Sequence, residues 1–281
     1  MKRECKLCGL NKELKESHII PKFITDWIKK TSATGFLRQA VTSNKRIQDG
    51  IKEYMLCSDC EMIFSKYEDY FSKEWFYPHS NNKLKELNYG IGLKKFIISV
   101  SWRILAYSLD DFEINNPKMG KYAREAYHIW KDYLLVERQD ILEYKTHLFI
   151  FEYVNDSTSN LPSKFQFYTL RAIDGTIYYN QELVHVYVKF PGFILFSTIY
   201  PTNPNGWVNT EIFDSGTLII PQEISYAGFG DFLKERAELI SRNPVSNPQQ
   251  RKLNETILKD KNRFINSTTY DVWVEENKRI S

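Results

Sequence analysis

The sequence predicts an α+β protein with a small metal-binding module at its amino terminus, and three observations support this. All four cysteines lie in two C-x-x-C pairs within the first sixty residues, apolar residues recur at helical spacing near the middle, and an alternating apolar pattern begins near residue 146. We therefore expect four segments: a zinc module over 1–75, a helical pair over 76–145, an antiparallel β-sheet domain over 146–225 and a helical tail over 226–281.

The two cysteine pairs predict a zinc site. Each pair can direct two thiolates at one point, so Cys5, Cys8, Cys57 and Cys60 together match a tetrahedral four-sulfur structural zinc site. Two disulfides or one redox pair are the alternatives. No signal peptide precedes the first pair, so we expect a cytoplasmic chain, where disulfides are rare. A single redox motif would leave the other pair unexplained.

A histidine lies between the two cysteine pairs. The segment Glu16-Ser17-His18-Ile19-Ile20-Pro21 is a short apolar run of β type that ends at proline. A cysteine pair, a strand with a histidine, a long loop and a second cysteine pair that opens a helix follow one another in the order of a treble clef. With these motifs, the first quarter of the chain resembles the zinc-containing branch of the HNH, or ββα-metal, endonucleases. The matching positions are Cys5, Cys8, His18, Ile19, Pro21, Leu56, Cys57 and Cys60.

The resemblance implies a metal-dependent nuclease that hydrolyses phosphodiester bonds in nucleic acid, with His18 as the general base. The sequence departs from the family pattern at three metal-site positions, Ser17, Lys52 and Glu61, although Asn44 and Asp49 lie in the same loop as Lys52. Glu61 is then the expected catalytic ligand for Mg²⁺ or Mn²⁺, because hard ions prefer carboxylates. The alternative is a noncatalytic zinc-stabilised module that binds nucleic acid or a protein partner.

Charge is concentrated in the amino-terminal module. Residues 1–60 hold twelve Lys or Arg against seven Asp or Glu, a local balance of +5, whereas the whole chain is +3. A basic excess suits a polyanion, so we expect nucleic acid as the partner, with DNA as the first expectation. In the loop 31–50, Arg38, Lys45 and Arg46 are the candidate contacts to the nucleic-acid backbone. A solvated loop is the alternative.

Helices are predicted where apolar residues recur at helical spacing, over 22–30, 59 to about 72, 93–109, 117–136 and 229–242, with a polar helix or tail after them. Residues 73–92 are predicted as a connector. Glu61 and Glu68 share one side of the second helix and could complete a metal site near His18, but for Glu68 a solvated face is favoured. Arg103, inside an apolar helix, is interpreted as a structural tether rather than a phosphate contact.

The second half of the chain predicts an antiparallel sheet of five or six strands, which is also a candidate surface for a protein partner. Asp174-Gly175 is predicted as its clearest hairpin turn. His147 and His185 receive no ligand role. No run of eighteen apolar residues occurs, so no membrane span is expected, and no glycine-rich loop supports nucleotide use. The predicted strands are 147–154, 164–173, 176–179, 183–189, 193–199 and 217–220.

Overall fold

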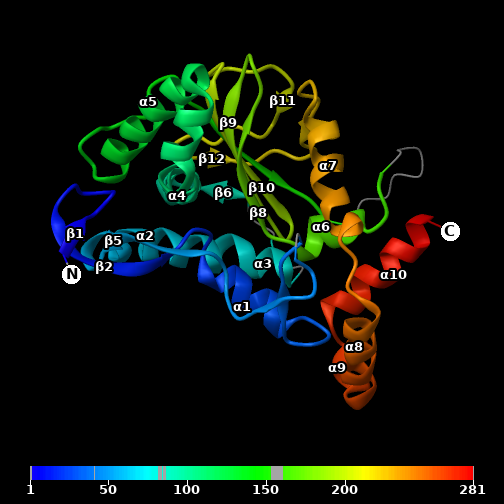
Figure 1. The fold of residues 1–281 in the computed structure, drawn as a ribbon. Coiled ribbons are helices and arrows are strands. Elements are labelled where there is room, and N and C mark those ends of the chain that lie inside the picture. The colour runs from blue at the N-terminus through cyan, green and yellow to red at the C-terminus, as the bar shows by residue number, and fades with distance from the viewer. Residues whose placement is uncertain (1, 41, 82–83, 85–86, 153–160, 281) are drawn as a thin grey trace.

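Figure 1 shows the computed structural model, which describes residues 2–40, 42–81, 84, 87–152 and 161–280. The amino-terminal module, coloured blue to cyan, runs along one side of the molecule, and a four-stranded sheet stands next to it. The largest cluster of buried side chains extends from Cys5 to Leu218, so the module, the helices and the sheet share one hydrophobic core. In the described residues no helix is long and apolar enough to cross a membrane.

The amino-terminal module contains a three-stranded antiparallel sheet in the order β1-β2-β5, with β1 at Lys2–Glu4, β2 at Asn11–His18 and β5 at Lys52–Cys57. The first cysteine pair forms the turn between β1 and β2. The loop between β2 and β5 contains helix α1 (Lys22–Lys30) and a short hairpin of β3 (Leu37–Arg38) and β4 (Arg46–Ile47). Helix α2 (Ser58–Phe71) starts at the second cysteine pair.

The predicted connector 73–92 is wrong over 73–80 and over its last two residues, because both parts are helical. Helix α2 continues without a break into a π-helical turn, η1 (Ser72–Phe76), and then into α3 (Tyr77–Ser80). The buried aromatic residues Phe71, Trp75 and Phe76 explain the continuation, because they extend the apolar stripe of α2 into the core. Among the described residues that follow, β6 (Asn88–Tyr89) leads into the long helices.

Two helices pack together between the module and the sheet. They are α4 (Ile91–Asn115), which is buried over most of its length, and α5 (Pro117–Leu134), which begins with proline in its first turn. The module docks on this pair at its first turn, where Lys6 Nζ donates to the Ala106 carbonyl and the Tyr127 hydroxyl donates to the Lys6 carbonyl at 2.9 Å.

The central sheet has four antiparallel strands in the order β7-β10-β9-β8. Alternate side chains of β9 point to opposite faces: Val184, Val186 and Val188 join the main core, whereas Tyr187 joins an aromatic cluster that includes Phe229, the first residue of helix α7 (Phe229–Arg242). The bounds are β7 Thr146–Ile150, β8 Asp174–Tyr179, β9 Val184–Phe190 and β10 Phe193–Tyr200. The predicted strand 147–154 therefore starts one residue late and runs past the end of β7 at Ile150, and its last two residues lie outside the described part of the chain.

The prediction of a strand over 164–173 is wrong, because this segment forms helix α6 (Phe165–Arg171). Its amino terminus is capped from far along the chain: the Glu276 carboxylate accepts the backbone N–H groups of Lys164 and Gln166 at 2.7 and 2.9 Å. The predicted turn at Asp174-Gly175 is also wrong, since both residues lie within β8. A Cβ at Gly175 would approach Ile104 Cδ1 to 2.7 Å, so close packing of α4 explains this glycine.

The remaining elements cover the sheet and the module. Residues 217–220, predicted as a strand, contribute only the end of β12 (Gly216–Thr217), which pairs with β6. Strand β11 (Trp207–Val208) pairs with β13 (Glu223–Ile224), and helix α7 (Phe229–Arg242) packs on the aromatic face of the sheet. The carboxy-terminal helices, at the lower right of Figure 1, are α8 (Asn247–Lys259), α9 (Lys261–Ile265) and α10 (Thr268–Ile280).

The carboxy-terminal segment is bonded to the amino-terminal module. Thr268 N–H donates to the Thr31 carbonyl at 3.1 Å, just after α1. The hairpin of β3 and β4 is held by two further bonds, from Ser246 N–H to Asn44 Oδ1 at 2.8 Å and from Ser43 Oγ to the Pro244 carbonyl at 3.1 Å.

Candidate functional site

The four cysteine sulfurs meet where β1 turns into β2 and where β5 leads into α2. All four Sγ atoms lie within 4.8 Å of one another, and those of Cys8 and Cys57 are 3.9 Å apart. In a tetrahedral zinc site with Zn–S bonds of about 2.3 Å, the sulfurs are about 3.8 Å apart. All four side chains are free cysteines. The cluster therefore has the size and the donor set to bind a metal such as zinc.

Local backbone contacts bring the two pairs together. Gly9, with a φ of 71°, closes the first turn by donating its N–H to the Cys5 carbonyl at 2.8 Å. Lys6 N–H donates to the Met55 carbonyl at 2.9 Å, which joins this turn to β5, and Cys57 N–H donates to Cys5 Sγ at 3.3 Å. A hydrogen bond from the Cys60 thiol lowers the pKa of Cys5, and the same contact raises the pKa of Cys60, so Cys5 is the thiolate of this pair.

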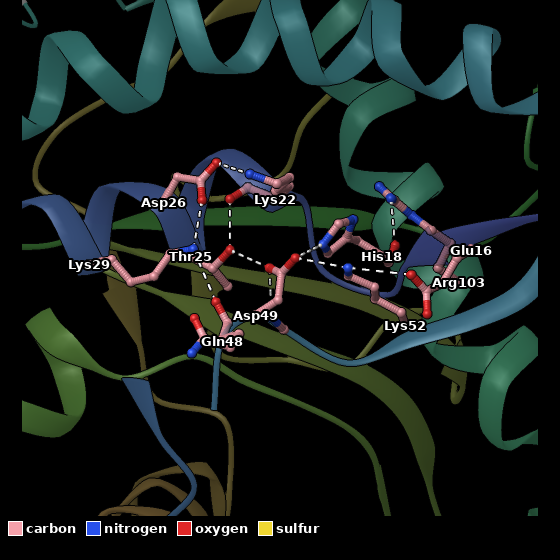
Figure 2. A network of polar contacts seen from close by, with 11 residues as sticks. Glu16, His18, Lys22, Thr25, Asp26, Lys29, Gln48, Asp49, Lys52 and Arg103 are labelled. Carbon is pink, nitrogen blue, oxygen red and sulfur yellow. Dashed lines mark hydrogen bonds and ion pairs between the residues drawn. The ribbon is translucent and has the colours of Figure 1, made fainter. Parts of the chain in front are cut away.

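His18, the last residue of β2, contacts Asp49 in the loop before β5 (Figure 2). Its Nε2 lies 2.9 Å from Asp49 Oδ2, and the two side chains are 16% and 18% exposed. An ionised carboxylate can only accept, so the neutral imidazole carries its proton on Nε2 and keeps its lone pair on Nδ1. Among the described residues, Nδ1 has no hydrogen-bond partner, so it is the atom of this ring that can accept a proton.

Asp49 is surrounded by donors. Its Oδ1 accepts from Gly50 N–H at 2.9 Å and lies 3.2 Å from Thr25 Oγ1, whose single proton is shared with the closer Lys22 carbonyl at 2.8 Å. Its Oδ2 accepts from His18 and contacts Lys52 Nζ at 3.0 Å. Burial raises the pKa of Asp49, but the hydrogen bonds from His18, Lys52 and Gly50 outweigh it and hold that pKa well below its usual range. Asp49 is therefore charged, and three of the roughly four lone-pair positions of its carboxylate are occupied by His18, Lys52 and Gly50.

Arg103 joins the histidine site to α2 and α4. Its side chain is 2% exposed, and Nη1 donates both to the His18 carbonyl at 2.9 Å and to Glu68 Oε1 at 2.7 Å. These contacts are those of a structural tether. The expectation of a solvated Glu68 is wrong, because its carboxylate pairs with this arginine and is only 23% exposed.

Glu61 is separate from this network. It follows Cys60 in the first turn of α2, and its buried Oε1 has no hydrogen-bond partner among the described residues. In the parts of the chain that the structure describes, the four cysteines are the only group of three or more His, Cys, Asp or Glu side chains whose ligand atoms lie close enough to share one ion. Glu61, His18 and Asp49 therefore do not form a ready-made ligand set.

The sequence did not single out Asp49 as the partner of His18. Strand pairing is what brings them together: His18 lies opposite Lys52 in the register of β2 and β5, and Asp49 is three residues before Lys52. The sequence signal for this contact was that an acidic residue, Asp49, lies just before β5, the strand that pairs with the strand of His18. A sequence reading cannot fix that register, because β2 and β5 are also joined with a bulge at Lys15 and Glu16.

The three predicted backbone-binding residues lie on the hairpin of β3 and β4. Arg46 is exposed and stacks over the Phe36 ring at 4.1 Å, and Lys45 is exposed in the turn. Arg38 is half-buried and donates from Nη1 to the Ser43 carbonyl at 2.7 Å, which shapes the hairpin. Lys29 Nζ donates to the Gln48 carbonyl at 3.1 Å, so the residue that follows β4, next to Asp49, is bonded to α1.

These groups can act on an anionic substrate. A neutral imidazole with a free Nδ1 can take a proton from a hydroxyl group, and the neighbouring Lys52 ammonium can face a negative charge. Comparison of the chain with protein-family models, with curated proteins and with solved structures found no match.

Proposed function

We propose that this chain is a nucleic-acid phosphodiesterase of the HNH type, with His18 as its general base. The hydrogen bond from His18 Nε2 to Asp49 is the observation that carries the proposal. It fixes the tautomer and the orientation of the ring and stabilises the imidazolium that forms when Nδ1 accepts a proton. A general base of this kind contributes roughly 10²- to 10⁴-fold to a rate.

In this proposal the four cysteines hold one structural zinc ion in a treble clef. The spacing of the sulfurs supports a tetrahedral ion, and a closed set of four thiolates leaves no open position for substrate. The ion would fasten the start of β2 to the end of β5. Because these two strands carry His18 and Lys52 at their other ends, the zinc would set the register on which the histidine site depends.

The nucleic-acid backbone is assigned to the hairpin of β3 and β4. Lys45 and Arg46 are exposed there, and the hairpin belongs to the segment with the local charge balance of +5. The link from Lys29 to Gln48 supports this assignment, since it keeps the hairpin next to the loop that carries Asp49.

The catalytic Mg²⁺ or Mn²⁺ ion that the resemblance implies does not fit the residues present. Three donors already engage Asp49, Arg103 occupies Glu68, and Glu61 does not join a ligand group with His18 among the described residues. Hard divalent ions need several oxygen ligands, and a bound ion would have to displace the Lys52 ammonium from Asp49. No step of the reaction is therefore assigned to such an ion.

The second candidate function is a noncatalytic zinc-stabilised module that binds nucleic acid or a protein partner. The contacts around Asp49 favour it, because they also join β2, α1 and β5 into one hydrogen-bonded unit and leave His18 only 16% exposed. In this case the contact between His18 and Asp49 is structural and holds these elements together.

One experiment separates the two candidates. Purified protein is incubated with plasmid DNA and with RNA, in buffers with magnesium, with manganese and with neither. His18→Ala should lower cleavage by roughly a hundredfold or more, while zinc content and folding stay unchanged. His128→Ala is the matched control, because His128 is exposed on α5. If His18→Ala loses zinc or thermal stability, or if the parent cleaves nothing, the binding module replaces the nuclease. A folded variant that cleaves at the parent rate would show that His18 is not the base.

A further inference from the structure

Lys52 occupies the place beside His18 where a positive charge is needed. Its Nζ lies 3.0 Å from Asp49 Oδ2 and 3.4 Å from Glu16 Oε2, and its side chain is 27% exposed. An ammonium group has three donors, so one remains for another anion after these two contacts. Because His18 Nε2 and Lys52 Nζ contact the same oxygen, these two nitrogens lie within about 6 Å of each other. The proposed base, Nδ1, is about 2 Å from Nε2 across the ring, so it lies at most about 8 Å from Lys52 Nζ. A ribose hydroxyl and its adjacent phosphate together can span such a distance.

We propose that the substrate of this site is RNA, which His18 and Lys52 cleave through attack of the ribose 2′-hydroxyl, without a catalytic metal ion. This proposal rests on the phosphodiesterase function proposed above and names its substrate class. The disagreement between the implied ion and the residues present supports it: Asp49 is paired with Lys52, Glu68 is paired with Arg103, and Glu61 forms no ligand group with His18 among the described residues.

The reaction balances with these groups alone. His18 Nδ1 removes the proton of the 2′-hydroxyl, the 2′-oxygen forms a bond to the adjacent phosphorus, and the bond from phosphorus to the 5′-oxygen breaks. The electron pair of that bond goes to the 5′-oxygen, which takes a proton from water, and His18 then returns its proton to solvent. Lys52 stabilises the negative charge that develops on the phosphate oxygens. The products are a 2′,3′-cyclic phosphate and a 5′-hydroxyl end.

DNA does not offer this route. It lacks the 2′-hydroxyl, so water would have to attack, and metal ions are what lower the pKa of bound water from 15.7 to about 7 in hydrolytic enzymes. In RNA the nucleophile is the 2′-hydroxyl of the substrate, which is already held next to the phosphorus. This avoids the entropic cost of positioning a water molecule. A general base and an ammonium group without a metal ion are therefore better suited to the cleavage of RNA than to that of DNA.

The test uses the full chain with its zinc retained, as checked by metal analysis, in buffer freed of other divalent ions. The substrates are a labelled single-stranded RNA, the DNA of the same sequence, and the RNA with one 2′-deoxy residue. We expect cleavage of RNA alone, with products one water lighter in mass than the linear phosphate, and no cleavage at the 2′-deoxy linkage. Magnesium should not increase the rate.

Variants assign the roles. Lys52→Met should lower RNA cleavage by about a hundredfold or more, as expected for loss of a charge that stabilises the transition state, and Lys52→Arg should restore part of it. Lys15→Met is the matched control and should cleave at the parent rate, because Lys15 is half-exposed on β2 and pairs only with Glu13 among the described residues.

The outcomes distinguish the two proposals. Magnesium-dependent cleavage of both DNA and RNA, with linear phosphate ends, would overturn the RNA mechanism and leave the phosphodiesterase. Cleavage of the 2′-deoxy linkage at the parent rate would also overturn it. If neither nucleic acid is cleaved under any of these conditions, both proposals fall. The RNA and 2′-deoxy arms use the parent protein, so they decide the question even if a Lys52 variant does not fold.

Discussion

Two buried histidines in the sheet should make the stability of this protein depend on pH. His147 and His185 are 3% and 0% exposed and lie beside the Phe196 ring. His185 is held as a neutral ring, since Nδ1 accepts from Ile199 N–H at 3.2 Å while Nε2 bonds to the Tyr226 hydroxyl at 3.1 Å. Protonation would break the bond to Ile199 and would place a charge among aromatic side chains.

The expected magnitude follows from the two pKa values. Burial lowers the pKa of His147 to about 3, helped by the charge of Lys145, and burial lowers that of His185 to about 3 as well. An unfolded histidine titrates near 6.5, so the unfolded chain binds more protons than the native one below that pH. Stability is therefore complete above about pH 6.5 and falls towards pH 3. Between about pH 7.5 and pH 5 the loss is roughly 2 kcal/mol for each ring and about 4 kcal/mol for the pair.

Denaturant unfolding followed by far-ultraviolet circular dichroism at several pH values measures this loss. His147→Gln should remove about half of the pH dependence, and the further substitution His185→Gln should remove most of the rest, even though both lower stability at neutral pH. His79, whose pKa is also lowered by burial, adds a smaller dependence of the same sign. The exposed His128 provides the control, since His128→Gln should leave the dependence unchanged. A parent protein that is equally stable at both ends of the pH range would refute the reasoning.

Three further predictions concern the zinc module and the packing of the module and of β8 against α4. Cys57→Ser should release the metal, expected as about one zinc per chain in the parent, and make residues 1–60 sensitive to limited proteolysis; retention of a full zinc equivalent would contradict a four-thiolate site. Arg103→Met should lower the free energy of unfolding by about 3 kcal/mol, because it removes one partner of a buried ion pair, whereas Arg124→Met, which breaks a more exposed pair, should cost less than about 1 kcal/mol. Equal losses in the two variants would contradict the tether. Gly175→Ala should lower thermal stability by about 1–3 kcal/mol, since its Cβ would meet Ile104, and an unchanged melting temperature would show that α4 can shift.

The parts of the fold that depend on local pattern were predictable from the sequence. Helices α1 (Lys22–Lys30) and α7 (Phe229–Arg242) have the predicted bounds, because their apolar spacing and their end signals lie within the segments themselves. The proximity of the four cysteines followed from their spacing. The error at α6 (Phe165–Arg171) has a different origin: its aromatic residues favour a strand, and the cap that favours a helix comes from Glu276, more than a hundred residues later.

The histidine site shows the same division. The sequence identified His18 as the residue of interest and named Asp49 only as a member of the loop. The register of β2 against β5 places Asp49 next to the His18 ring. Glu68 is paired instead with Arg103, which lies on α4. The paired state of Glu68 was unpredictable for this reason, since its partner Arg103 is distant in sequence.

The bonds between the carboxy-terminal segment and the amino-terminal module have a consequence for the order in which the protein matures. Asn44 and Ser43 obtain their partners from residues 246 and 244, about two hundred positions later, and Thr31 obtains its partner from residue 268. Domains fold from the amino terminus as they leave the ribosome, and contacts of such long range form only when residues 244–268 have emerged. The basic hairpin therefore reaches its final support last. During synthesis, before residues 244–268 have emerged, the surface that carries Lys45 and Arg46 is still incomplete.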